Sequence, residues 1–104
     1  MDINERIKQQ LASDRVLLYM KGSPDFPQCG FSARAVAVLK AVGTEFTHVN
    51  ILADAELREG LKRYSNWPTY PQLYVDGELI GGADIAEEMY RSGELQELID
   101  AKQS

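Results

Sequence analysis

The only cysteine of the chain, Cys29, stands where a reactive thiol is expected. It opens the segment Cys29-Gly30-Phe31-Ser32, at the point where a proline-containing loop becomes a helix. The first backbone N–H groups of a helix have no partner within it, and together with the helix dipole they favour a thiolate. Lys21, at the end of the preceding strand, adds a positive charge nearby. A buried structural cysteine is the alternative, but the position at a helix start favours a reactive thiol.

Ser32 limits what this thiol can do. It occupies the place that the second cysteine has in a redox motif of the form Cys-x-x-Cys. Its hydroxyl can donate a hydrogen bond to sulfur, but it cannot resolve a mixed disulfide. Because Cys29 is the only cysteine, a disulfide within the chain is excluded. With one cysteine and one histidine, His48, a tetrahedral zinc site from this chain alone is not expected.

Hydrophobic periodicity and turn residues predict the elements that position Cys29. The continuous apolar run Val16–Met20 is typical of a strand buried on both faces. In chain order, the sequence predicts a helix through Ile3, Ile7 and Leu11, a strand at Val16–Met20, a loop at 21–28, a helix at Gly30–Val42 closed by Gly43, a strand at Phe46–Ile51, a helix from Asp54 to about Tyr64, strands at Gln72–Val75 and Glu78–Ile80, a helix opened by a capping box of Asp84 and Glu87, and a last helix through Leu95, Leu98 and Ile99.

This element order, α-β-α-β-α-β-β-α-α, predicts one mixed sheet. The first two strands flank a helix, so the right-handed crossover rule makes them parallel. The last two strands flank Asp76-Gly77, a two-residue turn that favours an antiparallel hairpin. A four-stranded mixed sheet with helices on both faces satisfies these constraints, and this is the thioredoxin-like arrangement within the α/β class.

Composition narrows the class of protein. The 104 residues, 1–104, are expected to form a single domain, and the longest apolar run is far too short to cross a bilayer. The first residues lack the basic and apolar stretches of a signal peptide, so a cytoplasmic location is expected. The formal net charge of −5 argues against a nucleic-acid partner.

Four motifs together resemble the monothiol glutaredoxin family of the Cys-Gly-Phe-Ser class. They follow the family's order and spacing over nearly the whole chain, and they are Lys21-Gly22-Ser23-Pro24, Pro27-Gln28-Cys29-Gly30-Phe31-Ser32, Trp67-Pro68-Thr69-Tyr70-Pro71-Gln72 and Gly81-Gly82-Ala83-Asp84. The resemblance implies the glutaredoxin form of the thioredoxin-like fold and glutathione as a ligand.

The resemblance also implies where glutathione binds. Pro71, in the motif that contains Thr69, is cis in the family, and the bend exposes the backbone N–H and C=O of Tyr70 to the cysteinyl unit of glutathione. The backbone at Ala83 and Asp84 holds the γ-glutamyl end, and the Asp84 carboxylate faces its amine. Many relatives carry cysteine or serine where this chain has Ala83, so a mechanism with a second thiol there is excluded.

Lys21 and Arg58 match the family positions whose charges take the glycyl carboxylate. For three residues of these motifs and positions, a purely structural role is the alternative. Arg58 on a helix is more often solvated surface, Asp84 can serve only as a helix cap, and Trp67 is expected to be a packing residue rather than a ligand contact.

The family implies that Cys29 is a ligand of a [2Fe–2S] cluster. Such a cluster needs four ligands, usually thiolates, and this chain supplies one. Two chains with two glutathione thiols complete the set, which predicts a homodimer bridged by a labile cluster. The expected function is therefore iron–sulfur cluster carriage and transfer, with a place in iron homeostasis.

Two other functions remain open at the level of sequence. In the first, Cys29 is catalytic in glutathione-dependent thiol–disulfide exchange, with activity expected to be weak or absent. In the second, the chain acts through its partners. The resemblance implies a BolA-like protein and apo iron–sulfur recipient proteins as partners.

Overall fold

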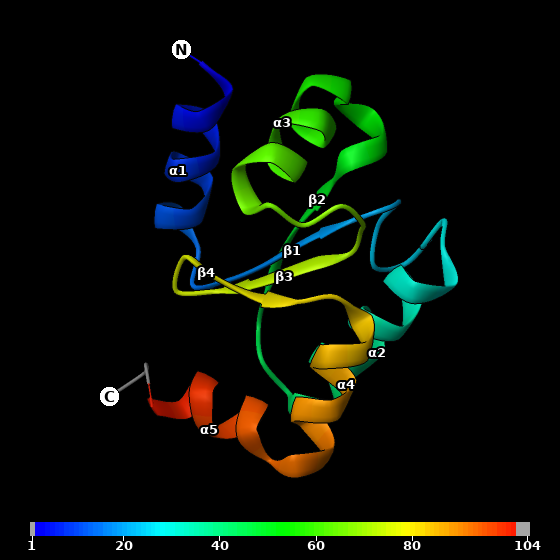
Figure 1. Cartoon of the computed structure of the whole chain (residues 1–104). Coiled ribbons are helices and arrows are strands. Elements are labelled where there is room, and N and C mark those ends of the chain that lie inside the picture. The colour runs from blue at the N-terminus through cyan, green and yellow to red at the C-terminus, as the bar shows by residue number, and fades with distance from the viewer. Residues whose placement is uncertain (1, 102–104) are drawn as a thin grey trace.

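The computed structural model describes residues 2–101, which form one four-stranded sheet covered by helices on both faces (Figure 1). The elements are α1 (Ile3–Ser13), β1 (Val16–Met20), α2 (Gly30–Val42), β2 (Thr47–Asn50), the 3₁₀ turn η1 (Ile51–Ala53), α3 (Ala55–Ser65), β3 (Gln72–Val75), β4 (Glu78–Gly81), α4 (Ala83–Ser92) and α5 (Glu94–Ala101).

The sheet has the strand order β2-β1-β3-β4. β1 runs parallel to β2 and antiparallel to β3, and β3 forms a hairpin with β4. The predicted fold class and topology are therefore confirmed.

β1 is apolar throughout because helices cover both of its sides. Val16, Leu18 and Met20 point into a core shared with α2, α4 and α5. Leu17 and Tyr19 point into a second core shared with α1 and α3. All five side chains are at most 4% exposed. Figure 1 shows the same division, with α1 and α3 on one face of the sheet and α2, α4 and α5 on the other.

The predicted helix ends and hairpin turn are confirmed, and hydrogen bonds explain where α1 and α3 begin. Asp2 and Asp54 each accept a hydrogen bond from the backbone N–H three residues further on, at 2.9 and 3.1 Å, and so begin α1 and α3. Gly43 ends α2 with a φ of 82°. The hairpin turn has positive φ at both central residues, Asp76 at 52° and Gly77 at 82°.

The prediction that Asp84 caps the fourth α-helix is wrong. Gly82 is the N-cap residue of α4, without a side-chain cap, and Asp84 lies inside the first turn. The helix begins earlier because β4 continues to Gly81, one residue beyond its predicted end, and leads directly into it.

β2 is one residue shorter at each end than predicted. Asn50 ends it because its side-chain oxygen accepts a hydrogen bond from the backbone N–H of Leu52 at 3.0 Å, which stabilises η1 in place of further strand. Phe46, at the other end, packs against the core outside the ladder.

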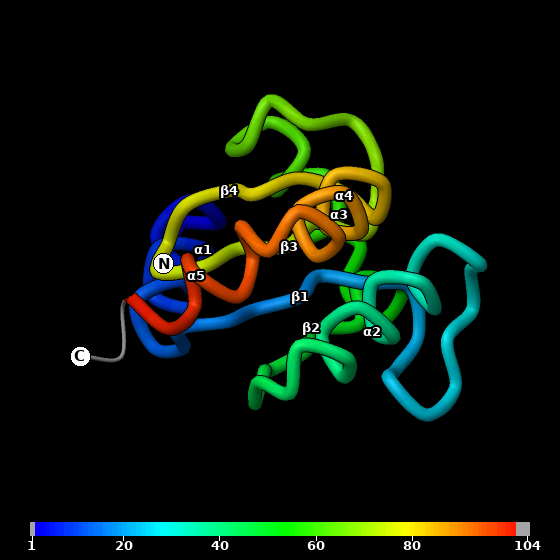
Figure 2. The backbone as a smooth tube through the Cα atoms, turned by 90° about the horizontal axis from the view of Figure 1, so that it is seen from below, coloured from blue at the N-terminus to red at the C-terminus, as the bar shows by residue number. Residues whose placement is uncertain are grey.

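The arrangement places two helix starts at the same end of the sheet. The loop between β1 and α2 projects at the end where β1 finishes, as Figure 2 shows in cyan. The start of α4 lies toward that end as well. This end of the molecule holds the candidate site.

Candidate functional site

Cys29 occupies the N-cap position of α2, with the residue partly exposed and its thiol free. The backbone N–H of Ser32 is the main cause that lowers the pKa of this thiol below its ordinary value. The N–H of Phe31, the charge of Lys21 and the Ser32 hydroxyl act in the same direction, while partial burial opposes them. The thiol therefore ionises at a lower pH than an isolated cysteine.

Ser32 has a structural role in addition to its effect on the pKa of the thiol. The residue is fully buried, and its Oγ accepts a hydrogen bond from the backbone N–H of Lys21 at 3.1 Å. This contact joins the end of β1 to the first turn of α2. It keeps Lys21 close to Cys29.

The loop before Cys29 is folded back on itself. The N–H of Gln28 donates to the carbonyl of Lys21 at 2.9 Å, and Gly22 pairs with Pro27 in an isolated bridge. Gly22 has a φ of 92°, and a Cβ there would lie 2.5 Å from the carbonyl oxygen of Phe26. Only glycine fits this position without displacing the loop.

The segment before β3 forms another wall of the site. The Tyr70–Pro71 peptide bond is cis, as the resemblance implies. The Tyr70 hydroxyl donates to the backbone carbonyl of Arg58 at 2.6 Å, which fixes the segment against α3. Fully buried Gln72 donates from Nε2 to the carbonyls of Trp67 and Thr69 at 3.1 and 3.3 Å. These contacts determine the course of the backbone at Thr69 and Tyr70.

The first turn of α4 forms the opposite wall. Because Gly82 provides no side-chain cap, the first N–H groups of α4 keep their capacity to bind an anion. Asp84 is 80% exposed, and its Oδ1 lies 3.0 Å from Nη2 of Arg34 on α2. The Asp84 carboxylate is therefore still largely exposed to solvent, despite its contact with Arg34.

These elements enclose a cavity of about 660 Å³. All eight site residues proposed from the sequence line it. They are Lys21, Cys29, Arg58, Thr69, Tyr70, Pro71, Ala83 and Asp84. The structure thus brings together segments that are up to 63 residues apart in the chain, from Lys21 to Asp84.

The cavity is also lined by six residues outside that set: Phe31, Lys62, Trp67, Pro68, Gly82 and Ile85. Lys62 is one of the basic residues of the sequence that could serve a small anionic ligand, and it lies one helical turn from Arg58 on α3. Trp67 was expected to be a packing residue, and no sequence signal distinguishes an indole in a core from one in a cavity wall.

Two buried donors in this wall have no protein partner. Among the described residues, the buried side-chain polar atoms that lack a hydrogen bond are Arg58 Nε and Trp67 Nε1. Both belong to residues that line the cavity. Both are donors, so the groups that could satisfy them are acceptors.

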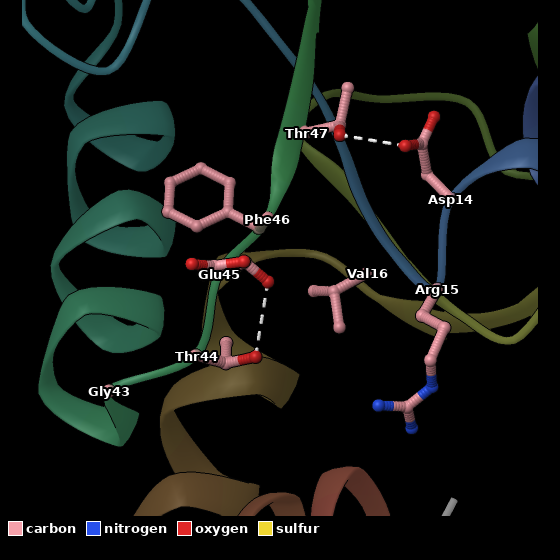
Figure 3. A pocket seen from close by; sticks show the side chains of 8 residues that line it. All are labelled: Asp14, Arg15, Val16, Gly43, Thr44, Glu45, Phe46 and Thr47. Atoms are coloured by element: carbon pink, nitrogen blue, oxygen red, sulfur yellow. Dashed lines mark hydrogen bonds between the residues drawn. The ribbon is translucent and has the colours of Figure 1, made fainter. Parts of the chain in front are cut away.

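A second cavity, of about 770 Å³, lies at the opposite end of the sheet, where β1 and β2 begin (Figure 3). Three of the polar side chains that line it, those of Asp14, Arg15 and Thr47, are hydrogen-bonded within the protein. Asp14 accepts a hydrogen bond from the hydroxyl of Thr47 at 3.0 Å. Arg15 donates to Asp76 at 3.1 Å and to the carbonyl of Ile99 at 3.0 Å.

Residues 2–101 contain no group of three or more His, Cys, Asp and Glu side chains arranged to hold a metal ion. In the same residues no helix has the length and apolar character needed to span a membrane.

The fold and this cavity define a thioredoxin-like protein with one accessible thiol at a helix start. Residues 16–80 match the family model described as Glutaredoxin. The chain is 58% identical over 95 residues to glutaredoxin 4 of Escherichia coli K12, which covers 91% of this chain and 83% of that protein. The chain belongs to the glutaredoxin family, and its single cysteine makes it a monothiol member.

Solved structures agree with this assignment. The solution structure of reduced poplar apo GrxS14 is 52% identical, has a TM-score of 0.82, and the match covers 95% of this chain and 91% of that one. A buckwheat glutaredoxin was solved as a complex with glutathione; its TM-score is 0.84, and the match covers 95% of this chain and 88% of that one. At 19% identity, this second likeness shows the fold alone.

Proposed function

We propose that the protein binds glutathione in the cavity beside Cys29 and carries a labile [2Fe–2S] cluster between two subunits. The observation that carries this proposal is the placement of the only thiol, with its lowered pKa, at a cavity with cations on one wall and an uncapped helix start on another. The cluster is cargo in this account, delivered to apo iron–sulfur proteins as part of iron homeostasis.

The charges of the cavity match those of glutathione, which has a carboxylate at each end and an ammonium beside one of them. Lys21 and Arg58 supply positive charge for the glycyl carboxylate. The first turn of α4, with Ala83 and Asp84, offers N–H groups for the γ-glutamyl carboxylate and a carboxylate for the ammonium. The backbone of Tyr70 is left to pair with the cysteinyl unit, whose thiol then lies beside Cys29.

The ligand count favours a bridged dimer. A [2Fe–2S] cluster usually takes four thiolates, the chain has one cysteine, and the described residues offer no other clustered metal-binding side chains. Two Cys29 thiolates and two glutathione thiolates complete the set. Because half of these ligands are exchangeable small molecules, the cluster is expected to leave readily, which suits a carrier.

The second candidate function is removal of glutathione from protein mixed disulfides, and the lowered pKa of Cys29 favours it. The Cys29 thiolate attacks the glutathione sulfur, a Cys29–glutathione disulfide forms, and the protein thiolate leaves and takes a proton. The thiolate of a second glutathione then attacks this disulfide, which yields oxidised glutathione and restores Cys29. We expect this activity to be weak or absent, because the cluster occupies the same sulfur.

The proposed partners rest on the family resemblance, and the proposed location rests on the chemistry of the thiol. Besides glutathione and a second copy of the chain, we propose recipient apo proteins and a BolA-like protein as partners. A net charge of −5 disfavours nucleic acid. A free thiol that must stay reduced fits the cytoplasm.

Anaerobic reconstitution with iron and sulfide, with and without glutathione, tests the proposal. Visible absorbance of a [2Fe–2S] cluster should develop only when glutathione is present, and Cys29→Ser should abolish it. Asp14→Asn, at the opposite end of the sheet, is the matched control and should reconstitute like the wild type. A stable cluster that forms without any added thiol would contradict the proposal.

A further inference from the structure

Trp67 has a buried hydrogen-bond donor that packing does not explain. Its Nε1 and Arg58 Nε are the two buried side-chain polar atoms without a hydrogen bond among residues 2–101, and both residues line the site cavity. Buried polar groups are rarely left unpaired, because each then carries its full desolvation cost. A phenylalanine would fill the same wall without that cost.

The backbone around Trp67 is fixed, so the ring is held in this wall. The Trp67 N–H donates to Ser65 Oγ at 3.1 Å, and the Trp67 carbonyl accepts from Gln72 Nε2 at 3.1 Å. Gln72 is fully buried. The segment on either side of the indole is therefore anchored to α3 and to β3.

The indole nitrogen borders the start of α4. A Cβ built on Gly82 would lie 3.9 Å from Trp67 Nε1 and 3.4 Å from the carbonyl oxygen of Pro71. Gly82 is the N-cap residue of α4, and the N–H groups that follow it form a seat for a carboxylate. The unpaired indole donor is therefore next to the place where the helix start receives an anion.

We propose that the Trp67 indole N–H donates a hydrogen bond to the carboxylate that docks at the start of α4. This inference rests on the proposed function, in which that group is the α-carboxylate of the γ-glutamyl unit of glutathione. Trp67 is then a specificity residue, which favours γ-glutamyl peptides over peptides that lack this carboxylate. The nitrogen is covered in the free protein, so binding includes a small movement of the indole or of the Gly82 backbone.

Trp67 is the only tryptophan of the chain, so the ¹⁵N-labelled protein gives one indole N–H cross-peak in a heteronuclear NMR spectrum. On titration with glutathione, this peak should move downfield and its exchange with solvent should slow. With 4-aminobutanoyl-cysteinyl-glycine, which is glutathione without the γ-glutamyl α-carboxylate, the peak should stay at its position in the free protein.

Binding measurements on Trp67→Phe supply the second test. This variant keeps an aromatic ring in the wall and removes the donor, so the Kd for glutathione should rise about tenfold, as expected for one hydrogen bond to a charged group. The Kd for the truncated peptide should change less than about twofold, because it lacks the acceptor. Tyr64→Phe is the matched control, since Tyr64 is an exposed aromatic of α3 outside the cavity wall.

The outcomes separate this inference from the proposed function. If glutathione shifts the backbone cross-peaks of Tyr70 and Asp84, but the indole peak stays in place, the inference is overturned and the proposed site stands. Equal binding of glutathione by Trp67→Phe and wild type has the same meaning. If no cross-peak of the cavity moves, both are overturned. Should Trp67→Phe not fold, the wild-type titration alone decides.

Discussion

The cavity at the start of β1 and the cavity at its end are similar in size, about 770 and 660 Å³, but their polar groups are engaged differently. At the start of the strand, Arg15 is bound to Asp76 and to the C-terminal part of α5, and Asp14 is bound to Thr47. At its end, the wall contains a thiol, two unpaired donors and a helix start without a side-chain cap. The site is therefore distinguished by hydrogen-bonding groups that have no partner in the protein, and not by its volume.

The direction of the helices explains this difference. α2 and α4 begin at the site cavity, at Cys29 and Gly82, so both present N–H groups and positive dipole ends to it. α1 and α2 end at the opposite cavity, at Asp14 and Gly43, where helices present carbonyl oxygens. The connections of the fold therefore make one end of the sheet suitable for a thiolate and carboxylates, and the other unsuitable.

The largest expected contrast between the two ends is in glutathione affinity. Lys21→Ala and Arg58→Ala each remove about 1 kcal/mol of charge-assisted binding, so each should weaken glutathione binding about fivefold and the double variant about 25-fold. Titration calorimetry on the apo protein measures this. Unchanged affinity in either single variant would mean that the substituted residue is solvated surface and does not bind glutathione.

Arg15→Met is the counterpart at the opposite end. Because its partners are Asp76 and the Ile99 carbonyl, we expect a loss of about 1 kcal/mol in the free energy of unfolding, a modest value since the pair is partly exposed. Glutathione affinity should stay at the wild-type value. Urea denaturation and calorimetry on the same sample check both statements, and weakened glutathione binding would break the comparison.

Alanine substitutions of Gly43 and Gly22 test how much stability depends on the backbone conformation at each end of the sheet. Gly43 has a φ of 82° with open space around it, so Gly43→Ala should cost about 1 kcal/mol of stability from backbone strain alone. Gly22→Ala adds contacts of 2.5 and 2.8 Å with backbone atoms of Phe26 and Gln28, and should cost about 3 kcal/mol. Equal losses in urea denaturation would mean that the loop before Cys29 yields easily.

The smallest predicted effect is on pH dependence. Because the folded pKa of Cys29 is lowered, chiefly by the backbone N–H of Ser32, the rate of alkylation by iodoacetamide should reach half of its maximum at a lower pH in the folded protein than in the urea-unfolded protein. The stability that this thiolate contributes is fully present above the unfolded pKa and is lost as the pH falls through the folded pKa. Lys21→Ala should move the alkylation midpoint upward, and an ordinary midpoint in the wild type would contradict the electrostatic account.

The sequence predicted most of the fold because its signals were local. β1, α2 and β3 have the predicted bounds, since a run such as Val16–Met20 is apolar only where both faces are covered. The start of α4 was wrong because Asp84 looks like a cap, whereas the end of β4 places Gly82 there. The 3₁₀ turn after β2 depends on the side chain of Asn50, which is bound both to that turn and to Gly22 28 residues away.

The candidate site was predictable only in part. The eight residues taken from the family resemblance all line the cavity, because the resemblance carries tertiary information that spacing alone lacks. The unpaired indole N–H of Trp67 is a feature of the site that the sequence could not predict. Whether an indole nitrogen has a partner depends on its neighbours in the folded chain, and here Gly82, 15 residues further on, lies beside it.

The central claim is that one thiol per chain and one glutathione per chain together hold the cluster. Native mass spectrometry of the anaerobically reconstituted protein tests it directly. The account predicts a species with two chains of 11.7 kDa, two glutathiones and one [2Fe–2S] cluster, and single chains after chelation of the iron. A cluster on a single chain, or on a dimer without glutathione, would contradict it.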